Sequence, residues 1–416
     1  MVNKMNLKIN LEYYPKLKDE PLTEDIKVIN QNKKNWQHPF FIDTESYIDL
    51  EEIRSLSSRF LDTDVKNIII LGTGGSIQTL SALSHLAKKT IYPITSSRAV
   101  ELNECLKNTD PENSVVIPIS RSGETLDVNS TIGTYIKKGY QFLGLSSRGT
   151  MNDLLKKIGA TILEVPDLSG RFAASITNVA IVPAFLAGIN IEQFLDGLKE
   201  GYDEFMTFHP NPSIEFASFL YHLYQKGYKV VFSMPYSKNL EGSIGLFVQE
   251  ISESTGKEGK GFMGAYQEAP LCQHSVLEYI LGGTKGAVVP VIYTVKDDIS
   301  DFQLESSIDY VDGKTAQTVV NYQADATFQA MIDQAVPCAK LSLNNPREQL
   351  IGNLVAFIQS TVYYLCLLLD VNWANNPKVD IGKKICNEAL QNNLSEEQRK
   401  ENRVLIAENK FKKFFE

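Results

Sequence analysis

Short β-branched runs alternate with longer helical patterns through the first half of the chain, and this alternation limits the possible folds more than any other feature. The strand-like runs are bounded by glycine or polar residues and cover residues 67–71, 114–120, 141–146 and 161–165. Helical patterns fill the intervals at residues 77–89, 125–138 and 151–158. Because strands that alternate with helices pair in parallel, the pattern predicts a doubly wound unit, a parallel sheet wrapped by helices.

A second round of the same pattern begins after residues 208–212, where prolines mark a connection between lobes. Its expected elements (helix, strand, helix, strand) cover residues 213–225, 229–234, 240–252 and 287–294. After residue 371 only helical patterns follow, at 379–390 and 395–415. We predict an α/β fold with two doubly wound parallel-sheet lobes, each a three-layer α/β/α unit. The predicted parts are an N-terminal arm at 1–45, a first lobe at 46–207, a second lobe at 208–372 and a C-terminal helical tail at 373–416.

Charge and apolar patterning argue against two kinds of partner. The 416 residues carry a formal net charge of -9 without a basic stripe that could hold a nucleic-acid backbone, so we expect no nucleic-acid partner. The most apolar run, residues 350–371, is interrupted by polar side chains and lacks the roughly 20 uninterrupted apolar residues of a membrane span. We expect a buried core helix there and no membrane partner.

The cysteines and the first residues indicate where the protein works. The five cysteines are scattered without a Cys-x-x-Cys pair, which predicts buried thiols and no zinc or redox site. No histidine pair shows metal-ligand spacing, so we predict no metal. The first residues are rich in lysine and asparagine and lack an apolar signal region, which indicates a cytoplasmic protein.

Two clusters at strand-to-helix junctions are suited to hold an anion. Residues 72–76 form a glycine-rich turn that favours an anion, although Ile77 breaks the spacing of a dinucleotide fingerprint. Residues 120–125 offer the hydroxyls of Ser120, Ser122 and Thr125 together with Arg121 and a helix N-terminus. Helix capping, worth about 1 kcal/mol, explains one hydroxyl but hardly the arginine and all the hydroxyls. We interpret this second cluster as a cradle for a doubly charged phosphate.

A carboxylate and an imidazole lie close together in the second half of the chain, at Glu253 and His274. Both groups can move protons near neutral pH. A lone glutamate near a helix end is most often solvated and a lone histidine is usually structural, so neither residue alone indicates chemistry. An anion cradle together with a proton shuttle predicts an aldose–ketose isomerase that acts on a sugar phosphate.

The motifs occur in one order along the chain, at residues 72–76, 120–125, 169–172, 249, 253–257, 273–275 and 379–383. Through these motifs and their order, residues 67–383 resemble proteins of the sugar isomerase (SIS) fold and specifically the glucose-6-phosphate isomerase family. The resemblance implies two SIS-type lobes and the reversible isomerisation of glucose 6-phosphate and fructose 6-phosphate, through a cis-enediol, in glycolysis and gluconeogenesis. It implies no metal and no organic cofactor.

The resemblance also implies roles for individual residues. Glu253 would be the general base that moves a proton between C1 and C2, and His274 would open the sugar ring. Arg171 would stabilise the enediolate, and Lys383 would assist from the C-terminal helix. The implied substrate contacts are Gly75, Ser76, Ser120, Arg121, Ser122, Thr125, Gln249 and Asn376. Because the family borrows its histidine from a second subunit, the resemblance implies a homodimer with a shared active site.

Some positions depart from the family's pattern. Arg121 stands where lysine is usual, Glu124 where threonine is usual, and Asn376 where glutamine is expected. Arginine keeps the positive charge but changes its reach and hydrogen-bond geometry. A carboxylate beside a phosphate must point away from it, or the site repels its ligand. These departures bear on efficiency and sugar specificity more than on the class of reaction.

Two alternatives stay open. One is a bifunctional phosphoglucose/phosphomannose isomerase, and the other is a non-catalytic sugar-phosphate-sensing SIS protein, since a fold alone does not fix a function. The joint presence of Glu253, His274, Arg171 and Lys383 favours an enzyme over a sensor. Glutamine-dependent amino-sugar synthesis is disfavoured, because it needs a nucleophilic cysteine at the mature N-terminus and the first cysteine here is Cys105.

Overall fold

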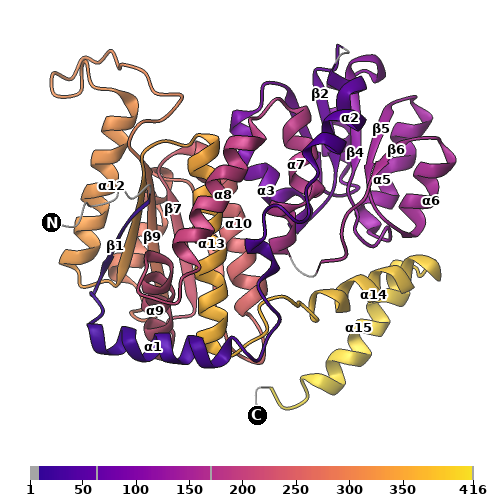
Figure 1. The fold of residues 1–416 in the computed structure, drawn as a ribbon. Coiled ribbons are helices and arrows are strands. Elements are labelled where there is room, and N and C mark those ends of the chain that lie inside the picture. The colour runs from indigo at the N-terminus through magenta and orange to yellow at the C-terminus, as the bar shows by residue number, and fades with distance from the viewer. Residues whose placement is uncertain (1–8, 62–63, 169–170, 415–416) are drawn as a thin grey trace. The chain divides into compact units, whose positions relative to one another are not determined.

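The computed structural model describes residues 9–61, 64–168 and 171–414, and the chain forms two compact units, Met1–Ala374 and Asn375–Glu416. The larger unit contains two five-stranded sheets with helices along their faces (Figure 1). The first sheet is parallel throughout. Its strands, in spatial order, are β3 (Thr90–Ile94), β2 (Asn67–Leu71), β4 (Ser114–Pro118), β5 (Gln141–Leu145) and β6 (Thr161–Leu163). All except β3 coincide with strands predicted from the sequence.

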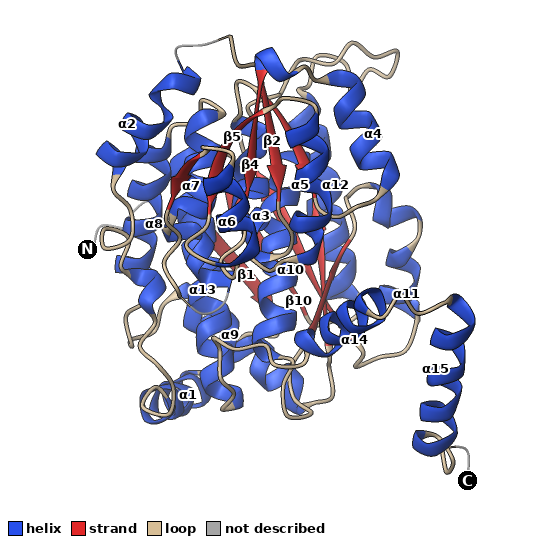
Figure 2. Cartoon of the chain, turned by 90° about the vertical axis from the view of Figure 1, so that its right-hand side faces the viewer, coloured by secondary structure: helices blue, strands red, loops and turns tan. Residues whose placement is uncertain are grey.

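Successive residues of a strand point to opposite faces, so each strand of the first sheet contributes to two cores. Ile68 and Ile70 of β2 belong to a core shared with α2 (Leu50–Leu61), α3 (Gly75–Leu83) and α7 (Asn178–Leu186). Ile69 and Leu71 belong to another, shared with α4 (Ala99–Asn108), α5 (Leu126–Lys137) and α6 (Gly149–Lys157). Figure 2 shows helices around β2, β4 and β5. The first lobe is therefore a three-layer α/β/α unit, as predicted.

The second sheet is parallel except for its first strand. Its spatial order is β1 (Ile9–Tyr14), β10 (Cys338–Leu343), β9 (Val288–Val295), β7 (Val230–Pro235) and β8 (Met263–Tyr266). Strand β1 runs antiparallel to β10, with Ile9 opposite Leu343. The sequence patterns predicted neither β1 nor the following helix α1 (Asp19–Asn32). The strand forms because Ile9 and Tyr13 point into the core, where they are only 2% and 4% exposed.

Helices between the two sheets join the lobes. Figure 1 shows α8 (Ile191–Phe205), α10 (Glu241–Thr255) and α13 (Glu348–Leu369) in this position, and α9 (Pro212–Gln225) packs against α13. The other face of the second sheet packs on α11 (Val276–Gly282) and α12 (Ala316–Asp333). The layer of helices between the sheets therefore brings the carboxyl half of the chain against α3 of the first lobe.

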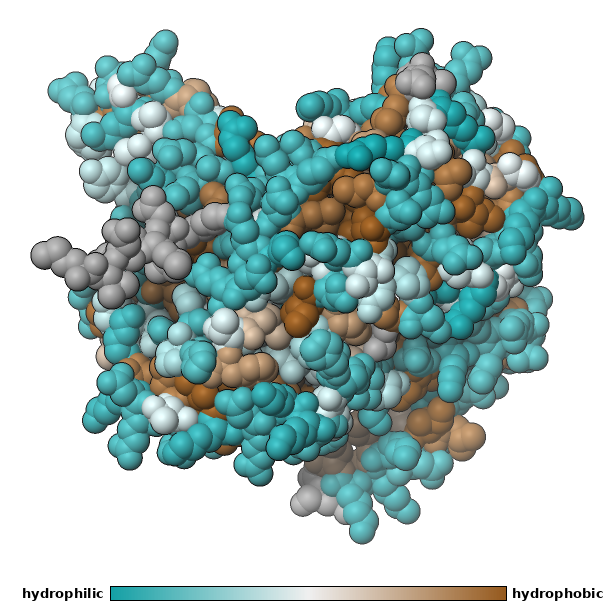
Figure 3. Space-filling view, in the orientation of Figure 1, coloured by the Kyte–Doolittle hydropathy of each residue, from teal (hydrophilic) through white to brown (hydrophobic). Residues whose placement is uncertain are grey.

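Helix α13 is the one described helix that is long and apolar enough to cross a membrane by length and composition, and its apolar window is fully buried in the structure. The prediction of a core helix at residues 350–371 is therefore confirmed. The space-filling view in Figure 3 shows hydrophilic side chains over most of one face, with apolar side chains gathered in smaller patches.

The smaller unit holds α14 (Val379–Gln391) and α15 (Glu396–Lys410), close to the helical patterns read from the sequence. Helix α15 begins at a capping box, in which Ser395 Oγ accepts from the Gln398 N–H at 3.2 Å and Gln398 Oε1 accepts from the Ser395 N–H at 2.9 Å. Apolar side chains of these helices, such as Ile385 and Leu405, are more than half exposed, at 62% and 63%. The boundaries of the arm, lobes and tail drawn from the sequence stay a prediction.

Candidate active site

The glycine-rich turn joins β2 to α3. Gly74 takes a positive φ of 59° just before the helix, a conformation that glycine adopts without strain. Gly75 and Ser76 then form the first turn of α3, and both are half-buried. The turn therefore presents the N-terminus of α3 at the carboxyl edge of the first sheet, where an anion is favoured.

Helix α10 brings a carboxylate to this turn. A Cβ built on Gly74 would lie 3.5 Å from Nε2 of Gln249, so this side chain touches the turn. The same Nε2 donates to Oε1 of Glu253 at 3.0 Å, one helical turn further along α10. The two helices approach closely because α10 has Gly242 at their contact, where a Cβ would lie 2.0 Å from the carbonyl oxygen of Ser81. Gln249 and Glu253 are thus brought together beside the glycine turn.

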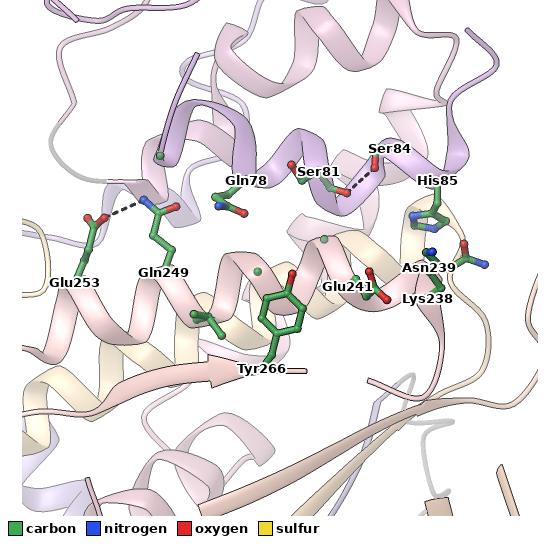
Figure 4. Close-up of a pocket in the computed structure, with 14 residues that line it drawn as sticks. Gln78, Ser81, Ser84, His85, Lys238, Asn239, Glu241, Gln249, Glu253 and Tyr266 are labelled. Atoms are coloured by element: carbon green, nitrogen blue, oxygen red, sulfur yellow. Dashed lines mark hydrogen bonds between the residues drawn. The ribbon is translucent and has the colours of Figure 1, made fainter. Parts of the chain in front are cut away.

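A groove of about 850 Å³ runs between α3 and α10 from this point. Figure 4 shows Glu253 and Gln249 at one end and Gln78 and Tyr266 further along. Its far end is lined by Ser84, His85, Lys238, Asn239 and Glu241, none of which we singled out from the sequence. Burial, and after it the neighbouring Glu268 carboxyl, raises the pKa of Glu241. Lys238 and Glu241 thus place an ammonium group and a carboxyl group at the far end of the groove.

The second anion loop follows β4, next to the glycine turn. The N–H of Ile119 donates to the carbonyl of Leu71 at 2.8 Å, which holds the two loops at the same edge of the sheet. Within the loop, the hydroxyls of Ser120 and Thr125 lie 2.8 Å apart, and Ser122 is exposed. The loop therefore presents hydroxyl groups and the start of α5 beside α3.

Arg121 is directed toward the segment before residue 169. Its guanidinium donates to the carbonyl of Leu168 and lies 3.8 Å from a carboxylate oxygen of Asp167. Arg148 contacts the other oxygen of Asp167 at 3.1 Å. All three charged side chains are well exposed, so these ion pairs are weak and a bound dianion can replace them.

Close backbone contact fixes the shape of this loop. Gly123 has a φ of +72°, and a Cβ there would lie 1.9 Å from the carbonyl oxygen of Arg148 and 2.7 Å from Cα of Gly149. Gly149 has a φ of +81°, and its own Cβ would lie 2.3 Å from the carbonyl oxygen of Ser122. Both positions therefore require glycine.

Glu124, which departs from the family's pattern, points away from the loop's hydroxyls. Its Oε1 accepts from the N–H of Thr150 at 2.7 Å and from the hydroxyl of Thr150 at 2.9 Å. Thr150 lies in the first turn of α6, whose free N–H groups favour a carboxylate. The negative charge is thus placed on another helix.

We predict that Glu124→Ala will lower the free energy of unfolding by about 1 kcal/mol, the usual value of a helix cap, because α6 loses its carboxylate. Affinity for a sugar phosphate is expected to stay the same. Urea denaturation and titration calorimetry measure the two effects, with Glu104→Ala on the exposed face of α4 as a control. A clear gain in affinity would contradict the orientation of Glu124.

His274 is not brought to Glu253 within one chain. It ends the short helix η6 (Leu271–His274), is exposed, and does not line the groove. The preceding Gln273 fixes η6, because its Nε2 donates to Tyr236 Oη at 2.7 Å and to Thr327 Oγ1. The imidazole is therefore presented to the outside from a well-anchored backbone.

The remaining predicted residues have other positions. Arg171 begins the short helix η4 (Arg171–Ile176), but its side chain lies outside the described part of the structure. Asn376 and Lys383 belong to the smaller unit. Lys383 Nζ lies 3.1 Å from Oδ1 of Asp380 in an exposed pair on α14. Among the described residues, no group of three or more His, Cys, Asp or Glu side chains is arranged to hold a metal.

Comparison with solved structures shows the fold of the chain. A hypothetical protein of Thermus thermophilus matches with a TM-score of 0.80 at 19% identity, over 89% of this chain and 96% of the other. A glucose-6-phosphate isomerase of Chlamydia trachomatis matches with a TM-score of 0.79 at 18% identity, over 96% and 92%. A structure described as a putative phosphosugar isomerase of Clostridium difficile matches at a TM-score of 0.52 and 13% identity, over 88% and 97%. The chain has the sugar isomerase fold, as predicted.

Comparison with curated sequences gives the nearer relationship. A probable glucose-6-phosphate isomerase of Methanococcus maripaludis is 25% identical over 388 residues, which cover 88% of this chain and 87% of the relative. The glucose-6-phosphate isomerases of Methanocaldococcus jannaschii and Mycoplasmopsis pulmonis are 26% and 27% identical, over 77% and 80% of this chain and 83% and 85% of theirs. No family model matches the chain. The chain is similar to glucose-6-phosphate isomerases over most of its length, and the resemblance read from its motifs is confirmed.

Proposed function

We propose that this protein interconverts glucose 6-phosphate and fructose 6-phosphate. The observation that carries the proposal is the position of Glu253, hydrogen-bonded to Gln249 on the wall of a groove that begins at the Gly74 turn. A carboxylate at that place reaches C1 and C2 of an opened sugar whose phosphate lies on the neighbouring loops. Homology to glucose-6-phosphate isomerases over most of the chain supports the same reaction.

In this proposal, the phosphate binds where the two loops meet at the edge of the first sheet. The proposed ligands are Gly75, Ser76, Ser120, Arg121, Ser122 and Thr125. Two helix N-termini and a guanidinium there attract the negatively charged phosphate. Glu253 then takes a proton from C2 of the aldose and returns it to C1, the hydroxyl proton of O2 passes to O1, and Gln249 fixes the carboxylate. The cis-enediolate formed between these steps carries negative charge on oxygen, which Arg171 would stabilise.

We propose that His274 enters the groove of a second copy, so that the active form is a homodimer. The supporting observation is that His274 is exposed and lies beside exposed apolar side chains. Leu271 and Tyr279 are 54% and 45% exposed, and so is Tyr266 in the groove, at 45%. Exposed apolar side chains such as those beside His274 are typical of a surface that a partner covers.

We also propose that Asn376 contacts the substrate and that Lys383 assists the reaction. Lys383 would leave its exposed pair with Asp380 to contact the substrate, and such a pair is weak enough to exchange. All the cysteines except Cys386 are buried thiols, which supports the cytoplasmic location that we propose. We also propose that the reaction needs no metal or organic cofactor.

A panel of hexose phosphates tests the function. The purified chain, incubated in D₂O with fructose 6-phosphate, is expected to form glucose 6-phosphate with deuterium at C2, because the proton that Glu253 holds at the enediol stage exchanges with solvent before it returns to carbon. NMR follows product and label together. Comparable turnover of mannose 6-phosphate would assign the broader isomerase instead, and binding without turnover of any sugar would overturn the proposal in favour of a sensor.

A further inference from the structure

Glu250 is a buried carboxyl that the proposed chemistry does not use. It stands next to Gln249 in α10 but is completely buried. A buried carboxyl is costly unless hydrogen bonds satisfy it. Gln359, in the middle of α13, supplies one of them, because its Nε2 donates to Oε1 of Glu250 at 2.8 Å. The pair joins α10 to the central helix of the core.

The hydrogen bonds continue from Gln359 into the first lobe. Its Nε2 also donates to Oγ of Ser175 in η4 at 3.1 Å, and Oγ of Ser175 lies 3.0 Å from Oγ1 of Thr79 in α3. On the other side, the hydroxyl of Tyr202 in α8 donates to Oε1 of Gln359. Burial, and after it the negative charge of Glu250, raises the pKa of Tyr202, so the phenol stays a donor at neutral pH. The network is buried throughout.

Each end of this network holds a segment that carries a residue of the proposed site. Thr79 follows Ser76 by about one turn of α3, and Ser175 follows Arg171 within η4. Glu250 precedes Glu253 by about one turn of α10. A hydrogen-bonded network in a low-dielectric interior resists displacement, since breaking it leaves further buried groups without partners. The network thus fixes the three segments relative to one another.

We propose that Glu250 and Gln359 are positioning residues, whose buried hydrogen bond sets the place of the Glu253 carboxylate relative to α3 and η4. The inference rests on the proposed isomerase function and adds residues that touch no substrate. A displacement of about 1 Å at a reacting group costs about a hundredfold in rate. The network therefore controls turnover more than it controls binding of the phosphate.

A swap of the two side chains tests the proposal. Gln359→Glu sets a second carboxyl against Glu250 in the core, and we expect kcat to fall about a hundredfold while KM for fructose 6-phosphate changes less than about threefold. In the double variant Glu250→Gln with Gln359→Glu, the amide and carboxylate have exchanged places. Tyr202 can still donate to position 359, and the hydroxyl of Ser175, which accepts from Gln359 in the original protein, can rotate to donate to the new carboxylate, so kcat is expected to return to within about threefold of the original.

Tyr364→Phe is the matched control. Tyr364 is a buried residue of the same helix α13, and its hydroxyl donates to the carbonyl of Phe205 at 2.9 Å, outside the network. The variant removes one buried hydrogen bond of α13 and is expected to lower stability without changing kcat. A fall in kcat equal to that of Gln359→Glu would show that any weakening of α13 suffices, and would overturn the proposal.

Hydrogen exchange gives a readout that does not depend on catalysis. Backbone amides of residues 171–176 and 249–255 are expected to exchange faster in Gln359→Glu and at the original rate in the double variant and in Tyr364→Phe. If the original protein isomerises no sugar phosphate, the proposed function fails, and exchange still decides whether the network holds these segments. Unchanged exchange in Gln359→Glu, or a double variant as impaired as the single one, overturns the inference.

Discussion

Replacing Glu253 by glutamine is expected to lower kcat by roughly 10² to 10⁴, the usual contribution of a general base. Glutamine has the same shape and can still accept the hydrogen bond that Gln249 donates at 3.0 Å, so the groove keeps its form. It cannot take a proton from a carbon atom. Steady-state isomerisation measures the loss, and calorimetric titration with 6-phosphogluconate, a poorly reactive sugar phosphate, is expected to show unchanged affinity.

The control is Glu258→Gln, a matched change at an exposed residue just beyond the end of α10. Glu258 lies outside the groove, so the variant is expected to keep full activity. If Glu253→Gln retained more than about a tenth of the original kcat, Glu253 would not be the general base, and another carboxyl would have to be sought.

Mixing two inactive variants is expected to restore activity. Glu253→Gln and His274→Ala chains would each be inactive alone, because every site of each homodimer lacks one group. After unfolding and refolding together, half of the dimers are mixed, and each of these has one complete site and one doubly defective site. The expected activity is about a quarter of the original, for random pairing in a two-fold dimer.

A mixture of Glu253→Gln with Glu253→Ala is the control for this experiment, because no pairing of these chains contains a complete site. It is expected to stay inactive. Failure of the first mixture, when size measurements show that mixed dimers have formed, would mean that His274 acts within its own chain or not at all. The exposure of His274 on η6 would then need another explanation.

Local patterns predicted most of the first lobe, because its strands are rich in β-branched residues and several of its helices end at glycine. They did not predict β1, whose partner β10 lies at the far end of the chain and whose pairing leaves no local signal beyond weak alternation. Edge strand β3 contains Pro93, which breaks a strand pattern and is tolerated at an edge. Helix α7 is apolar on almost every side and so shows no helical period.

The start of helix α8 is marked in the sequence by a capping residue. Asn190 caps it by accepting from the N–H of Gln193 at 3.1 Å, and Asn is a preferred residue at that position. Local spacing joins residues of the groove only where they share an element. Gln249 and Glu253 are one turn apart on α10, whereas His85 and Lys238 reach the far end of the groove from different elements. Gln359 lies 109 residues from Glu250, so no local pattern joins them.

The close contact between Gly123 and Gly149 has an evolutionary consequence. Gly123 and Gly149 face each other so closely that a methyl group on either would overlap the other loop's backbone. A lineage cannot replace one of them by stepwise drift without passing through a form whose loops have separated. Among descendants of this chain, the pair is therefore expected to be inherited as a single character, either kept together or lost together.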